Sequence, residues 1–519
     1  MRRVVVGIDA GTTTVKALVV GVDGEVCGKA TRTMTVDVPE AGHAERDMDA
    51  VWGAVSEVVP EVLAAVGEVE VLAVGVTGQG DGAWLVDTDG APVRPAILWL
   101  DGRSEGVVRK WEVDGRATAV WDATGSVPFA GSLPAIVDWL RENEPDTLRR
   151  ARYHLNCKDW IRFRLTGEAV TDPSEASRTY LDVATGKYSD TMLEALGHGD
   201  IRRLLPRVLP SAQVGGWVTD TAAEQTGLPV GTPVIVGAVD TAATAAGLGL
   251  SHPGEAYAIL GTTAFYAVIT SSFRRPPTPV GFTLPLGLAP GWLSAMAPMA
   301  AAPNLDWSRQ ALGYSTNSWE EVEAAAESAG PGAGGVVYLP YLAESGERAP
   351  FVDGDASAAY LGITRATTRG QLIRAAYEGV ALSLVDSLTE LPAVERLRLG
   401  GGASSNFFCQ ILSDVTGLPI ERPRCAEFGA RGVAAAALVA GGACPTMADA
   451  LHTMATDIDI FTPRPETRTV HQEQAQVFRQ IRTAVAPSWG LLRTLARYSR
   501  AALPPGAAVD PPTREAPSA

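Results

Sequence analysis

The chain has 519 residues, 46% of them hydrophobic and 20% charged, which is the composition of an ordinary globular protein. A single hydrophobic core stops growing at about 250 to 300 residues, so we expect two large domains. The net charge of −16, from 59 acidic and 43 basic residues, argues against nucleic acid or an anionic membrane as the main partner. The five cysteines are scattered without a Cys-x-x-Cys pair, and we find no long apolar segment. We therefore expect a cytoplasmic protein with neither a disulfide scaffold nor a zinc site.

The first predicted element is a buried strand, residues 4–8, that runs directly into the motif Asp9-Ala10-Gly11-Thr12-Thr13. A second apolar strand at residues 15–20 follows, so the motif forms the turn of a hairpin. Gly11 lets the backbone approach an anion closely, while Thr12 and Thr13 offer hydroxyl and N–H donors. Asp9 supplies an oxygen ligand of the kind that Mg²⁺ prefers. The motif predicts a phosphate-binding hairpin, with an ordinary polar turn as the alternative.

A helix is predicted at residues 48–66, from apolar residues at helical spacing, and a strand at residues 69–76. The glycines after this strand, Gly78, Gly80 and Gly82, partly match the dinucleotide-binding pattern G-x-G-x-x-G. That pattern must open a helix, whereas residues 83–90 read as a strand and a turn, so an oxidoreductase is not favoured. The pair Gly28-Lys29 lacks both the first glycine and the hydroxyl residue of a P-loop.

The middle of the chain predicts a second, related half. Residues 234–239 form a short apolar strand that ends at Asp240, and residues 241–249 are predicted as a helix. Residues 258–269 then repeat the first hairpin around Gly261-Thr262-Thr263, with Ile259 where the first copy has Asp9. Only the first half therefore keeps the acid that suits a metal. We place the boundary near residues 245–255, which gives domains at 1–250 and 251–490.

The C-terminal part of the chain contains a third glycine cluster. A predicted strand at residues 396–399 is followed by Gly400 to Gly402 and by a helix that opens at residues 403–406. Such a turn lets a nucleotide base or ribose lie directly on the backbone, and tight packing of helix on strand is the equal alternative. The tail, residues 491–519, is rich in proline from Leu503 onward and is predicted to be disordered.

The segment Ala358-x-Tyr360-x-Gly362-Ile363, followed after seven residues by Gln371-Leu372-x-x-Ala375-Ala376-Tyr377-Glu378, resembles the C-terminal signature of the FGGY family of carbohydrate kinases. Thr368 and Gln371 also have the spacing of a helix capping box, so the signature mainly indicates the structural framework of the fold. The resemblance runs from residue 4 to about residue 480. It implies an α/β fold of the actin, Hsp70 and hexokinase type (ribonuclease H-like), with two domains around a deep cleft. The family's N-terminal signature has a lysine where this chain has Ile136.

The resemblance also implies roles for individual residues. Asp240 matches the catalytic base, and its place between strand and helix leaves a helix N-cap as the alternative. Asp9 matches the acid that holds Mg²⁺, usually through water. ATP is the implied phosphate donor, with contacts to its phosphates and adenosine from Gly11, Thr12, Thr13, Lys16, Gly261, Thr262, Gly402 and Asn406. The implied substrate contacts are Gln79, Asp81, Trp99, Asp101, Arg103 and Asp240.

The implied reaction is transfer of the γ-phosphate of ATP to a sugar hydroxyl. The segments at residues 77–82, 99–103, 157–160 and 171–177 are most similar to erythritol kinases, and xylulokinases and L-xylulose kinases come next. Asp81 lies beside two glycines and offers acceptor atoms, which suits a neutral polyol or ketose better than a sugar acid. The alternative from a different class is an actin-like or Hsp70-like ATPase that switches partners. Many members of the family are dimers, so the resemblance leaves the oligomeric state open, with a homodimer as one alternative.

Overall fold

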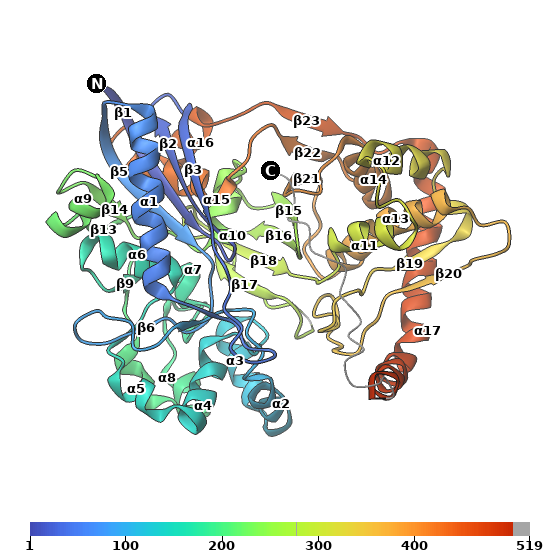
Figure 1. Ribbon diagram of the computed structural model, residues 1–519, viewed down its shortest axis with the longest axis horizontal. Helices are drawn as coiled ribbons and strands as arrows, with labels where there is room; N and C mark the ends of the chain where they lie inside the picture. Colours follow the sequence, from blue (N-terminus) through green and yellow to red (C-terminus); the bar gives the residue numbers. More distant parts are fainter. Residues whose placement is uncertain (277, 502–519) are drawn as a thin grey trace.

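The computed structural model describes residues 1–276 and 278–501, which form two mixed sheets with helices around them (Figure 1). In the first half of the chain, residues 2–247, six strands have the order β13-β14-β5-β1-β2-β3. In the second half, residues 256–501, seven strands have the order β17-β18-β16-β15-β21-β22-β23. The strands of the first sheet are β1 Arg2–Ala10, β2 Thr14–Gly21, β3 Val26–Thr33, β5 Val69–Gly78, β13 Val214–Trp217 and β14 Pro233–Ile235. Those of the second are β15 Ala256–Leu260, β16 Ala264–Thr270, β17 Phe282–Pro285, β18 Trp292–Met296, β21 Leu397–Gly400, β22 Ile420–Pro423 and β23 Ile458–Phe461.

The two sheets repeat one pattern of pairing. In the first, β1 pairs antiparallel with β2 and parallel with β5, and β14 continues the parallel run. In the second, β15 pairs antiparallel with β16 and parallel with β21, and β22 continues in the same way. This shared topology agrees with the two related halves that the repeated Gly-Thr-Thr hairpins predict.

Helices cover the sheets and build a cap beside the first one. Helix α1 (Met48–Val66) lies along β2 and β3 and matches the predicted range; its N-cap Asp47 accepts the N–H of Asp49. Helix α13 (Arg369–Leu388) begins with the predicted capping box of Thr368 and Gln371. The other helices of the first half are α2 Glu105–Asp114, α3 Arg116–Thr124, α4 Leu133–Asn143, α5 Pro145–Arg150, α6 Cys157–Thr166, α7 Pro173–Ala176, α8 Asp190–Leu196, α9 Asp220–Thr226 and α10 Asp240–Gly247. Those of the second half are α11 Pro303–Ala311, α12 Trp319–Ser328, α14 Asn406–Thr416, α15 Phe428–Ala440, α16 Met447–Thr453 and α17 Arg468–Ala501.

Short strand pairs complete the fold. In the first half, β4 with β7 and β6 with β8 join the loops around residues 45–154, and β9 with β12 and β10 with β11 lie farther along the chain. In the second half, β19 pairs with β20. Their bounds are β4 Glu45–Arg46, β6 Leu85–Val86, β7 Ala96–Ile97, β8 Tyr153–His154, β9 Val170–Thr171, β10 Leu181–Asp182, β11 Lys187–Tyr188, β12 Arg207–Val208, β19 Val337–Leu339 and β20 Ala359–Leu361.

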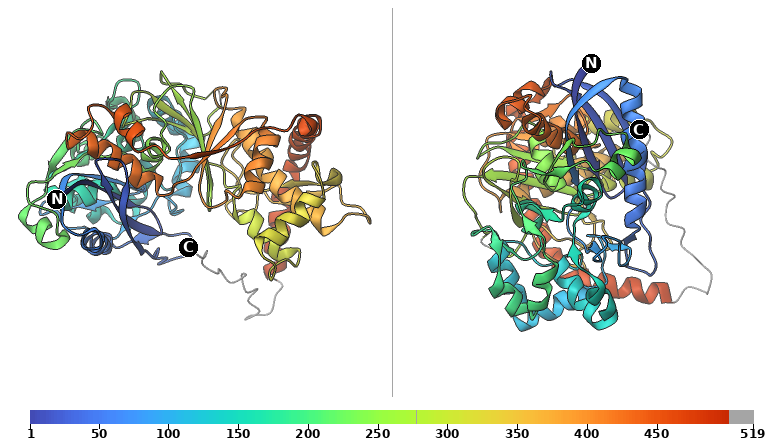
Figure 2. Two further views of the ribbon diagram at one scale, coloured as in Figure 1. Left: turned by 90° about the horizontal axis from the view of Figure 1, so that it is seen from above. Right: turned by 90° about the vertical axis from the view of Figure 1, so that its left-hand side faces the viewer.

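Helices α10 and α15 cross where the halves meet, and each packs partly on the sheet of the other half. The alanines of α10 share a buried cluster with residues of β15, β16 and β18. The alanines of α15 share another with Val5, Leu18 and Ala73 of the first sheet. Both views show α15 and α16, drawn in orange, against the blue first sheet rather than with the other helices of their own half (Figure 1; Figure 2). The two halves therefore share parts of their cores.

Glycines make this crossing close enough for backbone to touch backbone. A Cβ atom on Gly432 of α15 would lie 1.9 Å from the carbonyl oxygen of Ala243, and one on Gly247 of α10 would lie 1.8 Å from that of Phe428. Gly7 of β1 and Gly75 of β5 face α15 in the same way, at 2.3 Å from its carbonyl oxygens. No side chain fits at these positions, so the separation between the halves is set by backbone contact.

The structure differs from the predicted elements in two places. The strand predicted to reach residue 239 ends at Ile235 in β14, because Gly237 takes a positive φ of 79° and turns the chain. The predicted tail is helical over residues 491–501, since α17 continues to Ala501 and presents Leu491, Leu492, Leu495 and Tyr498 on its exposed side. Residues 502–519 lie outside the described part of the chain. Neither α17 nor any other helix in the described ranges has the length and apolar character needed to cross a membrane.

The close crossing of α10 and α15 predicts that a single added methyl group destabilises the folded protein. Gly432→Ala should destabilise the protein by about 3 kcal/mol, because its Cβ would overlap the Ala243 carbonyl oxygen and force α10 and α15 apart. The melting temperature measured by circular dichroism tests this. Gly53→Ala is the matched control, since Gly53 lies in α1 with open space around its Cβ and alanine there should stabilise by about 0.5 to 1 kcal/mol. Equal melting temperatures for the two variants would contradict the role of the crossing.

Candidate active site

The two Gly-Thr-Thr turns are hairpin tips with similar internal bonds. The N–H of Gly11 donates to the carbonyl oxygen of Thr14 at 2.9 Å, and that of Gly261 donates to Thr263 at 3.2 Å. Thr13 and Thr262 project from these tips and are exposed. Both predicted hairpins therefore exist, one in each half, and their binding of phosphate stays a prediction.

The third glycine cluster lies beside the second hairpin. The N–H of Ala403 donates to the carbonyl oxygen of Leu260, the residue before Gly261, at 3.3 Å. A Cβ on Gly402 would meet no atom within 4 Å, so a flat group can lie against this backbone. Asn406 is the first residue of α14, and its side-chain oxygen accepts from Arg422 at 2.8 Å. The structure thus brings together Gly261, Thr262, Gly402 and Asn406.

Two carboxyl groups, Asp9 and Asp240, lie near each other at the ends of elements that meet at the crossing. Asp9 is near the end of β1, and Asp240 is the first residue of α10. Burial, followed by repulsion from the Asp9 carboxylate, raises the pKa of Asp240 to about 7. Burial also raises the pKa of Asp9 to about 6, and the nearby Lys16 opposes this shift. Asp240 is therefore suited to take up a proton near neutral pH.

Asp240 is not the helix N-cap that the sequence offered as the alternative. Val239 occupies the N-cap position of α10. The side-chain hydrogen bond of Asp240 is short-range, from the N–H of its neighbour Thr241 at 2.6 Å. One carboxylate oxygen remains for a ligand.

The loop that carries Asp240 is held by a buried network. A Cβ on Gly237 would lie 2.0 Å from the carbonyl oxygen of Val76, so this turn requires glycine. Thr77 donates from its hydroxyl to the carbonyl oxygen of Ala238 at 2.7 Å, and Ser174 accepts the N–H of Val239 at 2.9 Å. Ser174 in turn donates to Asp172, a buried carboxylate that Ser211 and Lys158 also contact, at 2.7 and 3.0 Å. This fixes the direction in which α10 starts.

Gln79 and Trp99 are joined to the first hairpin by Thr12. The indole N–H of Trp99 donates to the Thr12 hydroxyl at 3.0 Å, and that hydroxyl donates to the side-chain oxygen of Gln79, also at 3.0 Å. Two predicted substrate residues and one predicted phosphate residue thus form a single chain of bonds. The side chain of Thr12 is therefore held in place by the two predicted substrate residues, Gln79 and Trp99.

Asp81 is paired with an arginine that the sequence analysis missed. The guanidinium of Arg178 donates to both oxygens of Asp81 at 3.1 to 3.2 Å. A second missed arginine, Arg348 from the other half, lies over the Trp99 ring at 5.6 Å. Arg178 follows the segment 171–177 directly, so its place next to a recognised motif was the one available signal; for Arg348 there was none.

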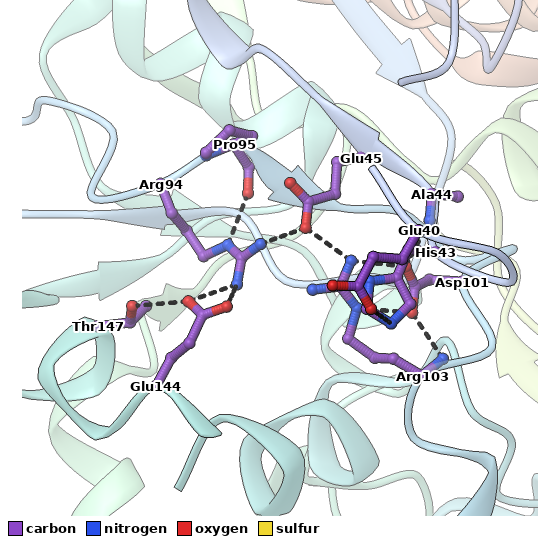
Figure 3. Close-up of polar contacts among 10 residues, drawn as sticks. All are labelled: Glu40, His43, Ala44, Glu45, Arg94, Pro95, Asp101, Arg103, Glu144 and Thr147. Carbon is purple, nitrogen blue, oxygen red and sulfur yellow. Dashed lines mark hydrogen bonds and ion pairs between the residues drawn. The ribbon is translucent and has the colours of Figure 1, made fainter. Parts of the chain in front are cut away.

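Asp101 and Arg103, which the resemblance implies as substrate contacts, bind each other and neighbouring protein groups (Figure 3). Asp101 accepts four hydrogen bonds, three from Arg103 and one from the N–H of Ala44. A carboxylate has about four acceptor sites, so none is left for a substrate. Arg103 is 1% exposed and also binds Glu45, which Arg94 contacts on its other side. The pair belongs to a structural chain of ions that ends at Glu144.

Ile136, which stands where the family signature has a lysine, lies in a hydrophobic core. Ile136 is fully buried on α4, in the apolar cluster of the helical cap. An aliphatic side chain there contributes packing with Leu140 and Leu133. The role of the family lysine does not carry over.

The residues present fit a nucleotide with a magnesium ion. Mg²⁺ is usually held by one or two carboxylates together with substrate phosphates and water. Asp9 supplies one carboxylate between the hairpin and α15, and a Cβ on Gly429 would lie 2.5 Å from its oxygen. Within residues 1–276 and 278–501 no cluster of three or more His, Cys, Asp or Glu side chains is arranged to hold a metal alone. Lys16 is 2.6 Å from Glu427, which also binds Lys29 at 3.2 Å.

A cavity of about 370 Å³ lies at the other end of α10, among α15, α16 and β21 to β23. Its lining includes Gly247, Arg398 and Arg431. It contains none of the predicted site residues. The chemistry above therefore lies outside this cavity.

The chain matches known protein families over most of its length. Residues 4–247 match the model of the FGGY family of carbohydrate kinases, N-terminal domain, and residues 256–441 match that of the C-terminal domain. Erythritol kinase from Brucella abortus is 31% identical over 510 residues, which cover 94% of this chain and 98% of the relative. Xylulose kinase from Escherichia coli is 30% identical, over 93% of this chain and 99% of the relative. The crystal structure of xylulose kinase from Rhodospirillum rubrum is 27% identical, with a TM-score of 0.86 and coverage of 94% and 100%.

The position of Asp240 predicts that removing its basicity abolishes most turnover. Asp240→Asn keeps the shape but cannot accept a proton, so kcat should fall on the order of 10² to 10⁴-fold, with ligand binding retained. Steady-state kinetics and isothermal titration calorimetry measure the two effects. Asp220→Asn is the matched control, because Asp220 is likewise the first residue of a helix, α9, and is exposed. A folded Asp240→Asn variant that keeps more than about a tenth of its turnover would remove Asp240 from the chemistry.

The raised pKa values predict opposite trends for activity and stability. Because the base must be ionised, kcat/KM should rise with pH and level off above about pH 7. The folded state binds protons more tightly than the unfolded chain, whose aspartate pKa is 3.8, so the free energy of unfolding should fall as pH rises from about 4 to about 7. Urea unfolding and kinetics over this range test both. In Asp240→Asn part of the stability trend should vanish; an unchanged trend would show that Asp240 does not titrate there.

Proposed function

This chain belongs to the FGGY family of carbohydrate kinases, and from that premise we propose that it transfers the γ-phosphoryl group of ATP to a hydroxyl of a small neutral polyol, erythritol. The observation that carries the proposal is the position of Asp240. Both Asp9, next to the first phosphate hairpin, and Asp81, on the predicted substrate side, act on its carboxyl and raise its pKa. An acid of the phosphate side and an acid of the predicted substrate side thus both influence Asp240, which supports a base that acts between the two ligands.

The residues of this chain supply positioning and a proton acceptor. A polyol hydroxyl is a weak nucleophile at neutral pH, so Asp240 takes its proton as the oxygen bonds to the γ-phosphorus and ADP leaves. The exposed threonines Thr13 and Thr262 at the hairpin tips would offer hydroxyl donors to the phosphates. A magnesium ion near Asp9 would neutralise phosphate charge when bound. The Gly402 turn would hold the adenosine.

The second candidate substrate is a pentulose such as D-xylulose or L-xylulose. A relative named xylulose kinase is 30% identical to this chain, against 31% for the one named erythritol kinase. This difference is too small to separate a tetritol from a five-carbon ketose. The homodimer and the cytoplasmic location remain predictions, as does the boundary at residues 245–255.

A substrate panel tests the proposal. Purified protein with ATP and Mg²⁺ should give its highest kcat/KM with erythritol among erythritol, D-xylulose, L-xylulose, D-ribulose, xylitol, glycerol and a sugar acid. ADP release measured by a coupled assay, with phosphorus NMR of the product, gives the rate and the position of the new ester. Asp240→Asn serves as the inactive control.

Three results would count against the proposal. A sugar acid as the best substrate would show that the polyol assignment is wrong. ATP turnover that needs no carbohydrate would favour a nucleotide switch of the actin or Hsp70 kind. Turnover only with a pentulose would replace erythritol by the second candidate.

A further inference from the structure

We propose that Arg348, in the loop between β19 and β20, is a catalytic residue that binds the phosphoryl group during its transfer from ATP to the substrate hydroxyl. This inference rests on the proposed function and adds a residue for which the sequence indicates no role. Arg348 comes from the second half of the chain, whereas Asp9 and Asp240 belong to the first. Each half would then supply a charged group to the same reaction.

The first anchor of Arg348 is the segment 297–302, which follows β18 and lies against the second hairpin. In this segment the carbonyl oxygen of Pro298 accepts the N–H of Ala264, the first residue of β16, at 3.1 Å. The Nε of Arg348 donates to the carbonyl oxygen of the preceding residue, Ala297, at 2.8 Å. Arg348 is therefore bound to the neighbour of a residue that contacts the second hairpin directly.

Glu347 holds the backbone of this loop on the same segment. Its buried carboxylate accepts the N–H of Met299 at 2.7 Å and the N–H of Arg348 itself at 2.9 Å. At the end of the segment, the N–H of Ala302 donates to the carbonyl oxygen of Gly261 at 3.2 Å. Arg348 thus has a fixed place relative to the second hairpin.

The second anchor of Arg348 joins it to the first hairpin. Its guanidinium carbon lies over the ring of Trp99, 5.6 Å from the ring centre. The indole N–H of Trp99 donates to the hydroxyl of Thr12 at 3.0 Å. Arg348 therefore contacts a neighbour of each predicted phosphate hairpin, and a γ-phosphate held by both hairpins would lie next to it.

The terminal nitrogens of Arg348 are free to bind an anion. Nη1 and Nη2 make no hydrogen bond to a described residue, and neither is among the buried polar atoms that lack a partner. Arg178, the other arginine that the sequence analysis missed, is paired with Asp81, whereas no carboxylate in the described ranges forms an ion pair with Arg348. A guanidinium presents its N–H groups in a planar fork that matches two oxygens of a phosphate.

This fork would act on charge that develops during the reaction. The substrate oxygen bonds to the γ-phosphorus while the bond from that phosphorus to the bridging oxygen of ADP breaks, and the proton of the hydroxyl passes to Asp240. The negative charge then lies on the three equatorial oxygens of the phosphoryl group. Arg348 stays protonated and donates N–H bonds to these oxygens. Such donors stabilise the transition state more than bound ATP, so their loss should lower kcat rather than raise the KM for ATP.

Variants at Arg348 test this role by steady-state kinetics. Arg348→Ala should lower kcat about 10²-fold to 10³-fold with the best substrate of the panel and leave the KM for ATP nearly unchanged. Arg348→Lys keeps a charge but loses the fork, so its kcat should fall about 10-fold to 150-fold.

Arg309→Ala is the matched control for the contacts that Arg348 makes within the protein. Arg309 also lies over a tryptophan ring, that of Trp319 at 4.9 Å, and its Nε also donates to a carbonyl oxygen, that of Tyr314 at 3.2 Å. Its kcat should stay close to that of the wild type, because these contacts are structural.

A mimic of the transition state provides a readout other than turnover. ADP with aluminium fluoride and Mg²⁺ places a planar anion where the phosphoryl group passes between its two oxygens. In isothermal titration calorimetry with the substrate present, Arg348→Ala should bind this mimic at least about 10-fold more weakly than the wild type and bind ADP alone equally well. Guanidinium ion added at millimolar concentration should restore part of the kcat of Arg348→Ala and none of that of Asp240→Asn.

The outcomes separate the role of Arg348 from the function beneath it. If Arg348→Ala loses no more kcat than Arg309→Ala, binds the mimic as tightly as the wild type, or raises only the KM for ATP, Arg348 is not catalytic while the kinase assignment stands. Wild-type kcat in Arg348→Lys would overturn the role even where the alanine variant does not fold. If the wild type phosphorylates no member of the panel, the proposed function is overturned, and this inference with it.

Discussion

The close crossing of α10 and α15 is the contact on which the arrangement of the site depends. Gly432 and Gly247 allow the two helix backbones to touch, and Gly7 and Gly75 allow α15 to rest on the first sheet. The same elements carry the acids. Asp240 begins α10, and Gly429 in the first turn of α15 leaves just enough space for the Asp9 carboxylate. Both acids belong to the first half and the second hairpin at Gly261 belongs to the other, so a change in the angle between the halves would change the distance between the acids and that hairpin.

Acids in this molecule fall into two kinds according to their partners. Asp101 and Asp172 are buried, accept bonds from several neighbours, and hold loops in place. Asp9 and Asp240 have few partners, and burial raises their pKa values. A carboxylate whose acceptor sites the protein fills holds the structure in place, whereas one that it leaves unsatisfied is ready to exchange a proton or bind a cation. Asp81 lies between these kinds, because Arg178 satisfies it only in part.

Local features of the sequence predicted local parts of the structure well. Both Gly-Thr-Thr hairpins, the α1 helix and the capping box of α13 depend on neighbours in the chain, and all are present. The side-chain partners were not predictable in this way. Arg178 is 97 residues from Asp81, and Arg348 comes from the other half, so no spacing signals either. The sequence could not show that Asp101 accepts four hydrogen bonds from the protein, because those bonds are visible only in three dimensions. The end of α17 was mistaken for part of a proline-rich tail, although the prolines begin only after Leu503.

The exchange of helices between the halves also has a consequence for synthesis on the ribosome. The face of the first sheet around Val5, Leu18 and Ala73 is covered by Ala430, Ala434 and Leu438. Roughly 360 residues separate Ala73 from Ala434, which at about 5 to 20 residues per second is about 20 to 70 seconds of translation. During that time the nascent chain displays an apolar sheet face that its own sequence cannot yet cover. Folding of the first half is therefore completed only after the second half has emerged.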